Sequence, residues 1–534
     1  MGLLDRGLPG LAVLGLTALA ACSLLVQSSA VQCNVDSDCL ARGFDAGGPM
    51  ACINNACVGP GVGGPCSTNA ECVTRNSGQP AICRHDTKQC AALLSPDCAQ
   101  VYGPYQDDNA IVLGSVLSLK GTNASSGQSE LNSAVLGLDD FTNTVVGLPN
   151  GAGGKPRPLV LVECDDSADD VTAQRSATHL VSDVGVPAIL GPDSSGLVTG
   201  VINKVTIPAK VLLISPAATS ATLSGISPYF WRTSPSDNIQ AVPLRLSVGE
   251  IATAQSLSPV KLAILYKNDS YGTGLFTAVT STLQINGAAV GAASNAANFK
   301  PVQYAADGSD LASGVSQVVG FVPNLVALFG TNEVISAGLT AIEASWPGGT
   351  TPPPRPYYLV SDGGEVQELL DAIKASSGLR TRVRGTVPGT NNPLFQAFNL
   401  KYQGKYGSPA NVFGMAGSYD SIYLLAYAID TLGSAPVDGT GIAAGMAKMV
   451  GGTTKIDVGP AGIQSAFSTL GSGAAIDING ASGPLDFDVN MHEAPSDIDV
   501  WCVTIDGQGN PAFKSSGRSF DSQSGQMVGT YSCP

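Results

Sequence analysis

Polar residues follow apolar, strand-like segments of the sequence at positions where binding groups commonly gather. Ser194 and Ser195 follow one such segment and open a helical pattern, so a hydroxyl and free backbone N–H groups would meet where an anion is favoured. Ala217 and Thr219 follow the next segment and add a hydroxyl and backbone groups. In open α/β sheets such groups gather at the carboxyl ends of the strands. The pattern predicts a site for the carboxylate of a small ligand.

Two further residues extend this candidate site. Tyr271 follows a strand and a turn, and would lie against a ligand as a flat amphipathic wall. Asp362 follows another apolar segment and offers a carboxylate. Each candidate has a structural alternative. A serine or threonine after a strand is most often a helix N-cap, Asp362 before two glycines is a turn residue, and Tyr271 is a packing residue.

The sequence offers little for catalysis. Its three histidines, His85, His179 and His492, form no cluster with metal-ligand spacing, and no serine stands in a Gly-x-Ser-x-Gly elbow. Residues 151–155 resemble a phosphate loop, but the spacing is wrong and Pro156 stands where a magnesium-binding hydroxyl is needed. We therefore expect no enzyme activity, no cofactor and no metal.

Composition excludes other classes of protein. Of 534 residues, 44% are hydrophobic and 13% charged, so large cores are expected and extensive disorder is not. The net charge of −15 argues against a nucleic-acid partner, because no basic surface is available to displace counterions from phosphates.

The amino-terminal segment reads as an export signal. An apolar run from Gly7 closes on Leu19-Ala20-Ala21-Cys22, which resembles a bacterial lipobox. We expect a signal peptide over 1–21, lipid on Cys22, and a periplasmic or surface protein anchored to a bacterial membrane. The alternatives are a signal peptide cut elsewhere or an uncleaved anchor that continues through Val26. Which membrane holds the protein stays open.

Nine of the thirteen cysteines fall between Cys33 and Cys98, and eight of them form a duplicated unit. The offsets between the two copies are 33, 33, 31 and 33 residues, from 66 − 33, 72 − 39, 83 − 52 and 90 − 57. Each copy is too short to bury a core, so we expect two disulfides in each and a cysteine-rich module over 22–105. A zinc ribbon is the rival interpretation, but CxxC pairs are absent. The eight cysteines are Cys33, Cys39, Cys52, Cys57, Cys66, Cys72, Cys83 and Cys90.

Four cysteines remain after Cys22 and the duplicated unit are set aside, and they allow three pairings. We favour Cys502–Cys533, since Trp501 lies on a late strand and a bond there would hold the chain terminus. Cys98–Cys164 is then left.

From about residue 108 the residue pattern changes, and apolar runs of strand length alternate with helical patterns. This alternation is typical of parallel sheets buried on both faces, and two such series predict two doubly wound α/β lobes. Helices are expected over 130–142 and 170–184. Strands are expected over 110–116, 159–163, 186–190, 211–214, 261–266, 325–329 and 357–360.

The order of the segments resembles the type I periplasmic binding proteins for leucine, isoleucine and valine, in the branch with amide and urea receptors. The resemblance covers nearly everything from residue 108 to the end, and the cysteine-rich segment before it has no counterpart in the family pattern. The stretches that carry it are 121–127, 190–195, 214–219, 231–237, 269–272, 361–363, 419–420 and 483–488.

The resemblance implies roles for the candidate residues. Ser195 and Thr219 would hold the carboxylate of an amino-acid ligand, the carbonyl of Ala217 would accept from its ammonium, and Asp362 would pair with that ammonium. Phe329 stands where relatives often have tyrosine. Ser126 replaces an aromatic residue of the leucine-binding members, although a purely structural role for Ser126 is favoured. Leucine specificity is therefore not expected, and the sequence leaves the ligand open.

The resemblance also implies a hinged molecule. Lobe 1 is expected to comprise 106–236 and 388–485, and lobe 2 to comprise 237–387 and 486–534, with hinges near 237, 387 and 486. The implied function is capture of a small amino-acid or amide-like ligand for an ABC permease. A ligand-sensing receptor and a structural surface lipoprotein are the alternatives.

Overall fold

The computed structural model describes residues 51–53, 56–58, 64–151, 153–389 and 392–533. The chain divides into two compact units, Met1–Gly64 and Pro65–Pro534. In the first unit, the antiparallel strands β1 (Ala51–Ile53) and β2 (Ala56–Val58) place Cys52 opposite Cys57. The predicted signal peptide 1–21, the lipidation of Cys22 and the disulfides of the first cysteine repeat lie outside the described residues.

The second cysteine repeat belongs to the same compact unit as the two predicted lobes, although the sequence analysis treats 22–105 as one module. It consists of helix α2 (Asn69–Arg75) and the antiparallel strands β3 (Ala81–Cys83) and β4 (Cys90–Ala92). The disulfides Cys66–Cys83 and Cys72–Cys90 cross-link it. Cross-links take the place of a large apolar core in this small body.

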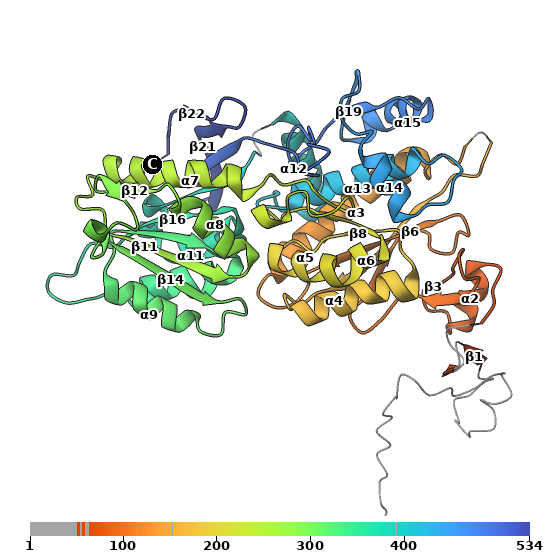
Figure 1. Ribbon diagram of the computed structural model, residues 1–534, viewed down its shortest axis with the longest axis horizontal. Helices are drawn as coiled ribbons and strands as arrows, with labels where there is room; N and C mark the ends of the chain where they lie inside the picture. The colour runs from red at the N-terminus through yellow and green to blue at the C-terminus, as the bar shows by residue number, and fades with distance from the viewer. Residues whose placement is uncertain (1–50, 54–55, 59–63, 152, 390–391, 534) are drawn as a thin grey trace, which may run out of the picture. The chain divides into compact units, whose positions relative to one another are not determined.

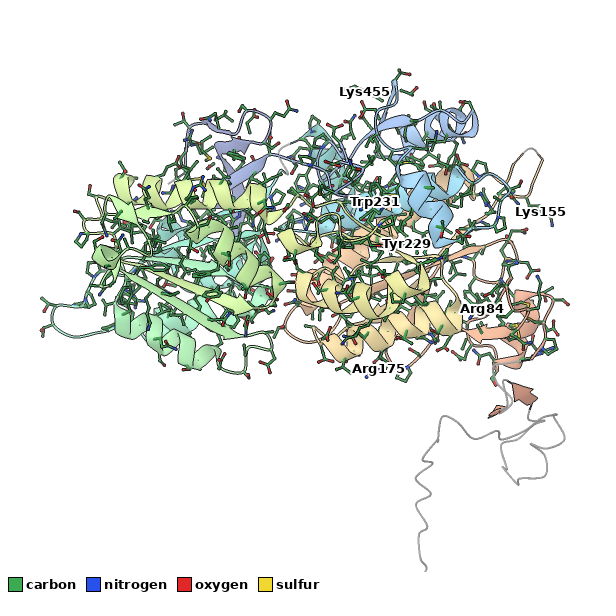
Figure 2. The ribbon with its side chains drawn as sticks, viewed as in Figure 1. Arg84, Lys155, Arg175, Tyr229, Trp231 and Lys455 are labelled. Atoms are coloured by element: carbon green, nitrogen blue, oxygen red, sulfur yellow. A yellow bond between two sulfur atoms is a disulfide. The ribbon has the colours of Figure 1, made fainter. Side chains whose placement is uncertain are left out.

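Several contacts fasten the second repeat to lobe 1. The Arg84 guanidinium donates to the carbonyl oxygens of Ser182 and Asp183, at 2.6 and 3.0 Å (Figure 2). A disulfide joins Cys98 to Cys164, which is the pairing left by the sequence argument. The chain then continues as strand β5 at the edge of the lobe 1 sheet, so the repeat and lobe 1 form one packed body.

Lobe 1 is built on a six-stranded sheet in which every neighbouring pair is parallel except β5 with β7. The predicted strand at 159–163 is confirmed, because β7 begins at Leu159. The strands in spatial order are β10 (Phe230–Arg232), β9 (Leu212–Ser215), β8 (Ala188–Leu190), β6 (Ile111–Leu117), β7 (Leu159–Asp165) and β5 (Gln100–Tyr102).

Helices cover both faces of this sheet, as Figure 1 shows. Successive residues of a strand point to opposite faces, so Leu161 packs toward one helical layer and Val162 toward the other. One layer contains α4 (Asp170–Thr178), η1 (His179–Val184), α5 (Ser195–Val201), η2 (Ile202–Thr206) and α6 (Ile207–Ala209). The other contains α3 (Ala124–Val145), α12 (Pro393–Tyr406), α13 (Met415–Asp430), α14 (Gly439–Met446) and α15 (Ile463–Gly471).

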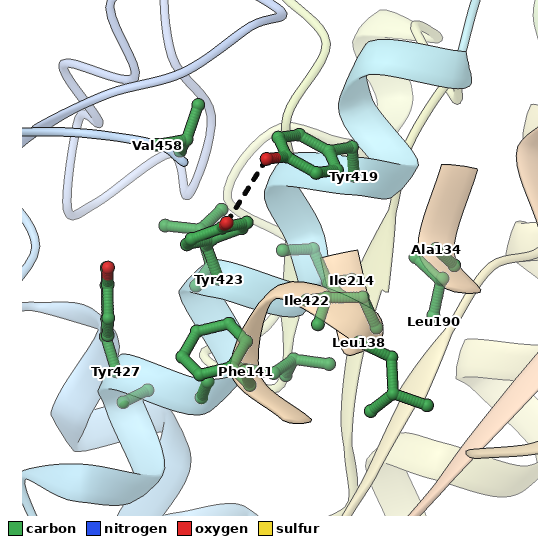
Figure 3. Packing of buried hydrophobic residues seen from close by; sticks show 14 of the residues in the cluster. Ala134, Leu138, Phe141, Leu190, Ile214, Tyr419, Ile422, Tyr423, Tyr427 and Val458 are labelled. Carbon is green, nitrogen blue, oxygen red and sulfur yellow. Dashed lines mark hydrogen bonds between the residues drawn. The ribbon is translucent and has the colours of Figure 1, made fainter. Parts of the chain in front are cut away.

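The pair of α3 and α13 forms the centre of the second layer. Phe141 of α3 packs against Tyr423 of α13, with 4.9 Å between ring centroids (Figure 3). The hydroxyl groups of Tyr419 and Tyr423 both donate to Asp140 Oδ2, at 2.6 and 2.7 Å, and Lys401 pairs with Asp140 Oδ1. A buried carboxylate thus has donors on both of its oxygens. The short parallel strands β18 (Thr454–Asp457) and β19 (Ile476–Asn479) lie beside this layer.

Lobe 2 is built on an eight-stranded mixed sheet. Its first five strands are parallel and its last three are antiparallel additions. The strands in spatial order are β14 (Phe299–Ala305), β11 (Leu262–Asn268), β15 (Leu325–Phe329), β16 (Tyr357–Val360), β17 (Val383–Pro388), β20 (Ile498–Ile505), β21 (Pro511–Asp521) and β22 (Gln526–Gly529). The strands predicted at 325–329 and 357–360 are confirmed.

Helices also cover the lobe 2 sheet on both faces. They are α7 (Asp237–Ala254), α8 (Ser270–Thr280), α9 (Leu311–Phe321), η5 (Val334–Leu339), α10 (Thr340–Ala344) and α11 (Gln367–Ala375). Short elements complete the fold: η3 (Ala221–Leu223), β12 (Gln284–Ile285), β13 (Ala288–Ala289), η4 (Ala293–Asn295), η6 (Asp362–Gly364), η7 (Ser377–Arg382) and η8 (Pro460–Gly462).

The carboxy-terminal strands close the free edge of lobe 2. Trp501 of β20 is buried against Gly385 of β17, where a Cβ atom would lie 2.1 Å from the Trp501 ring, so only glycine fits. Cys502 of the same strand is bonded to Cys533, as favoured from the sequence. The bond holds the chain end against the sheet.

The chain passes between the two sheets three times, after β10, after β17 and before β20. These crossings lie near the hinges expected at 237, 387 and 486. Within the described residues, no helix has the length and apolar character needed to cross a membrane.

Candidate functional site

A cavity of about 50 Å³ lies between the two lobes, at the carboxyl ends of the parallel strands of both sheets. This is where α/β sheets place ligands, because side chains and helix starts converge there. Its wall is formed by Asn123, Ser126, Glu130, Asp193, Ser194, Ser195, Ala217, Asp269, Tyr271, Thr331, Asn332, Asp362, Gly363, Glu365, Val366, Val412 and Phe413.

Six of the eight ligand-binding residues predicted from the sequence lie in this wall. They come from lobe 1 (Ser126, Ser194, Ser195 and Ala217) and from lobe 2 (Tyr271 and Asp362). The structure therefore brings together residues that lie up to 236 positions apart, from 362 − 126.

Two predicted residues do not reach the wall. Phe329 ends β15 with its side chain on the face opposite to that of Leu328, and it packs in the core beneath α8. Thr219 is buried behind the wall beside Asp237. Burial and Asp362 raise the pKa of the Asp237 carboxyl, and the Thr219 hydroxyl acts in the opposite direction.

Asp362 is held in place by donors from its own lobe. The Tyr271 hydroxyl and the Gln240 side-chain amide both donate to Asp362 Oδ1, at 2.5 Å each. The Tyr271 oxygen also lies 2.8 Å from Ser361 Oγ. Burial raises the pKa of Asp362, and these hydrogen bonds oppose the shift. The hydrogen bonds from Tyr271 and Gln240 therefore fix the direction of the carboxyl group.

Four other carboxyl groups share the wall, and the sequence analysis assigned none of them. Asp193 accepts from the Ser194 N–H at 2.6 Å, and Asp269 accepts from the Gly272 N–H at 2.8 Å as the cap of α8. The side chains of Glu130 and Glu365 accept no hydrogen bond from the described residues. Burial raises the pKa of all four groups.

Lys267, a buried cation near these acids, is already paired with Glu333. Lys267 Nζ lies 3.2 Å from Glu333 Oε1 and 3.2 Å from Thr331 Oγ1, and the lysine is not part of the wall. No lysine, arginine or histidine among the described residues lines the cavity. The wall is strongly acidic.

Hydrogen bonds between the lobes close the cavity on one side. Ser126 Oγ donates to Asn332 Oδ1 at 3.1 Å, and Asn332 Nδ2 donates to Ser125 Oγ at 3.0 Å. Ser125 Oγ in turn donates to Glu368 Oε1 at 2.7 Å. Elsewhere, Ser220 Oγ donates to the Ser270 carbonyl at 2.9 Å. The lobes are thus in contact, and Ser126 serves that contact as well as the wall.

Two α/β lobes that enclose a polar cavity at their strand ends define a solute-binding protein. The sequence model of the family described as "Periplasmic binding protein" matches residues 110–467, and the chain belongs to this family. It has the type I fold and is similar to leucine/isoleucine/valine-binding proteins, with a disulfide-rich segment ahead of the lobes. The family is not enzymatic, in agreement with the expectation from the sequence.

Known proteins resemble parts or most of the chain. It is 28% identical over 169 residues to Leu/Ile/Val-binding protein homolog 8 of Brucella abortus (strain 2308), which is 31% of this chain and 40% of that protein. The chain thus spans less than half of the relative. It is also 34% identical over 130 residues to glutamate receptor 2.4 of Arabidopsis thaliana, covering 24% of this chain and 14% of the receptor.

Solved structures share the fold at low sequence identity. A leucine-binding protein from Thermotoga maritima MSB8 matches with a TM-score of 0.56 and 18% identity, covering 76% of this chain and 98% of that one. A solute-binding protein from R. palustris in complex with 4-hydroxybenzoate gives a TM-score of 0.56 and 16% identity, covering 78% and 98%. The family and the disulfides together indicate an extracytoplasmic protein.

Proposed function

We propose that this protein captures a small amino-acid-like or amide-like ligand between its lobes and delivers it to an ABC permease. The observation that carries the proposal is the wall itself, where a fixed carboxyl group, Asp362, faces hydroxyl groups of Ser194 and Ser195 across the cavity. Asp362 accepts from the ligand ammonium, and the serine hydroxyls donate to its carboxyl or carbonyl oxygen.

Ligand binding is coupled to closure of the lobes. Contacts that exist only when the lobes meet, such as the ligand bridge from Asp362 to Ser195, shift the population toward the closed state. The proposed hinges are the crossings near 237, 387 and 486, with 106–236 and 388–485 as lobe 1 and 237–387 and 486–534 as lobe 2. The closed surface is what a permease would recognise.

Titration calorimetry on the purified protein tests the site. We expect one of a panel of L-amino acids and small amides to bind, and Asp362→Asn to weaken it about 10- to 100-fold, because one charged hydrogen bond is lost. Asp371→Asn, an exposed acid of the same lobe, is the matched control. Binding that is unchanged in Asp362→Asn would contradict the assignment. Tighter binding of 4-hydroxybenzoate, an anion without an amine, would contradict the ligand class.

The amino terminus supports a lipid anchor, because Leu19-Ala20-Ala21-Cys22 has the residues and position of a lipobox. Labelling cells with a radioactive fatty acid should mark the protein, and Cys22→Ser should abolish the label. A label that persists in Cys22→Ser would rule out this site.

Ligand sensing is the second candidate function, because one matched relative is named a glutamate receptor. The genes beside this one distinguish the two. Permease and ATPase genes favour import, whereas a kinase or regulator gene favours sensing.

A further inference from the structure

The cavity wall carries more negative groups than an amino acid can neutralise. Five carboxyl groups line it, two from lobe 1 and three from lobe 2, and no basic side chain of the described residues joins them. A zwitterion brings one ammonium and one carboxylate, so it satisfies Asp362 and adds a negative charge of its own. Burial raises the pKa of Asp193 and Asp269 and the charge of Lys267 lowers it, but Glu130 and Glu365 would remain without a counter-charge.

Among the described acids of the wall, Glu130 is the one with a buried oxygen that has no partner. Its side chain is 1% exposed and lies in the wall, and its Oε2 atom has no hydrogen-bond partner. The backbone is shaped to leave it space, because a Cβ at Gly414 would lie 2.0 Å from Glu130 Oε1. A buried carboxyl without donors costs folding free energy, so its retention beside a cavity points to donors that arrive with a ligand.

Glu365 repeats the pattern on the opposite lobe. It is 9% exposed, lines the same cavity, and accepts no side-chain hydrogen bond from the described residues. Glu130 lies on α3 of lobe 1, whereas Glu365 follows η6 and Asp362 in lobe 2. Acceptors without donors therefore face the cavity from both sides.

A metal ion does not account for this arrangement. In the described part of the chain, the single group of three or more ligand atoms within 4.8 Å of one another is formed by Cys66, Cys72 and Cys83. Those sulfurs are bonded in disulfides. The cavity carboxyls are too dispersed to share one ion, and spaced acceptors suit an organic cation with several N–H donors.

We infer that the ligand is a compact organic cation with two protonated nitrogen groups, one held at Asp362 in lobe 2 and the other at Glu130 in lobe 1. A diamine and a dibasic amino acid share this chemistry. The inference rests on the proposed function and narrows its ligand class. It also gives closure a physical cause, since a cation that bridges both lobes is fully paired only when they meet.

Proton release should accompany binding. Burial raises the pKa of Glu130 and Glu365 well above the usual value, so a part of these groups carries a proton before the ligand arrives. Asp193, Asp269 and Asp362 face the same cavity with pKa values raised in the same direction, and Lys267 behind the wall is paired with Glu333. A dication displaces those protons, so its affinity should rise as the pH is raised above about 4.5.

Matched ligand pairs test the inference by titration calorimetry. L-lysine is compared with L-norleucine, which lacks only the second amino group, and 1,4-diaminobutane is compared with 1-aminobutane. We expect at least one of the two diamino ligands to bind ten-fold or more tightly than its monoamino partner. Glu130→Gln should weaken the binding of that diamino ligand about 10- to 100-fold. It should change the affinity for the monoamino partner less than two-fold. Asp139→Asn, a partly exposed acid on the same helix but outside the wall, is the control and should leave the binding of both ligands unchanged.

Each other outcome overturns the inference. If L-norleucine binds as tightly as L-lysine, a site for a second ammonium group is excluded, while the proposed function stands. If amides bind and no amine does, the inference fails and the proposed function stands, whereas if neither class binds, both fail. If Glu130→Gln does not fold, Glu365→Gln and the wild-type ratio of L-lysine to L-norleucine decide the matter. A ratio near one overturns the inference.

Discussion

Helix α3 carries two buried acidic side chains, Asp140 and Glu130, whose surroundings differ sharply. Asp140 accepts hydrogen bonds from Tyr419 and Tyr423 and pairs with Lys401. Glu130 lies on the same helix at the cavity, and its Oε2 atom has no partner. A buried carboxyl with a full set of donors holds the packing together, whereas one that lacks donors beside a cavity identifies a binding surface.

The largest expected effect is at Asp140. Asp140→Ala leaves two buried hydroxyl groups and the Lys401 ammonium without their acceptor. We therefore expect the free energy of unfolding, measured in urea, to fall by about 3 kcal/mol. Asp139→Asn is the matched control, since its pair with Lys405 is largely exposed and should contribute less than about 1 kcal/mol. A loss at Asp140 no greater than that at Asp139 would break the contrast within α3.

A smaller effect of opposite sign is expected at Glu130. Glu130→Gln removes a buried charge that has no partner, so the ligand-free variant should be as stable as the wild type at neutral pH, or more stable by up to about 1 kcal/mol. Urea unfolding without ligand measures this difference. A clear loss of stability would mean that Glu130 has a structural partner and is not reserved for a ligand.

The pH dependence of that difference sharpens the prediction. Burial raises the pKa of Glu130 in the folded protein above the ordinary value of 4.5. Near and below pH 4.5 the group is protonated in the folded state and the burial of charge is avoided. As the pH rises, the unfolded chain loses its proton first, so the group opposes folding increasingly. The stability gain from Glu130→Gln should therefore shrink as the pH is lowered from 7 toward 4.5.

Much of the fold could be predicted from the sequence, because strands that are buried on both faces have unbroken apolar runs in the sequence. The runs at 159–163, 325–329 and 357–360 match β7, β15 and β16. Strand β5 has three residues and no such run, and its position depends on pairing with β7. The helix predicted at 130–142 begins at Ala124, because its first turns carry small polar residues that line the cavity and show no apolar period.

The candidate site was predictable in part for a similar reason. Ser195 and Asp362 follow strands directly, so position along the chain indicates them. Glu130 does not follow a strand, and an acid inside a helix ordinarily indicates a solvated face. Its burial beside the cavity becomes visible only in the structure. Asp193 and Asp269 stand within stretches that carry the family resemblance, and that signal was available.

The disulfide between Cys98 and Cys164 has a consequence for how the molecule moves. Together with the Arg84 contacts, this disulfide fixes the segment that follows the amino-terminal unit to lobe 1. Any tether that acts through that end of the chain therefore holds lobe 1 in place. If the lobes close about the proposed hinges, lobe 2 is then the part that moves relative to that tether, and it carries Asp269, Asp362 and Glu365 toward the ligand.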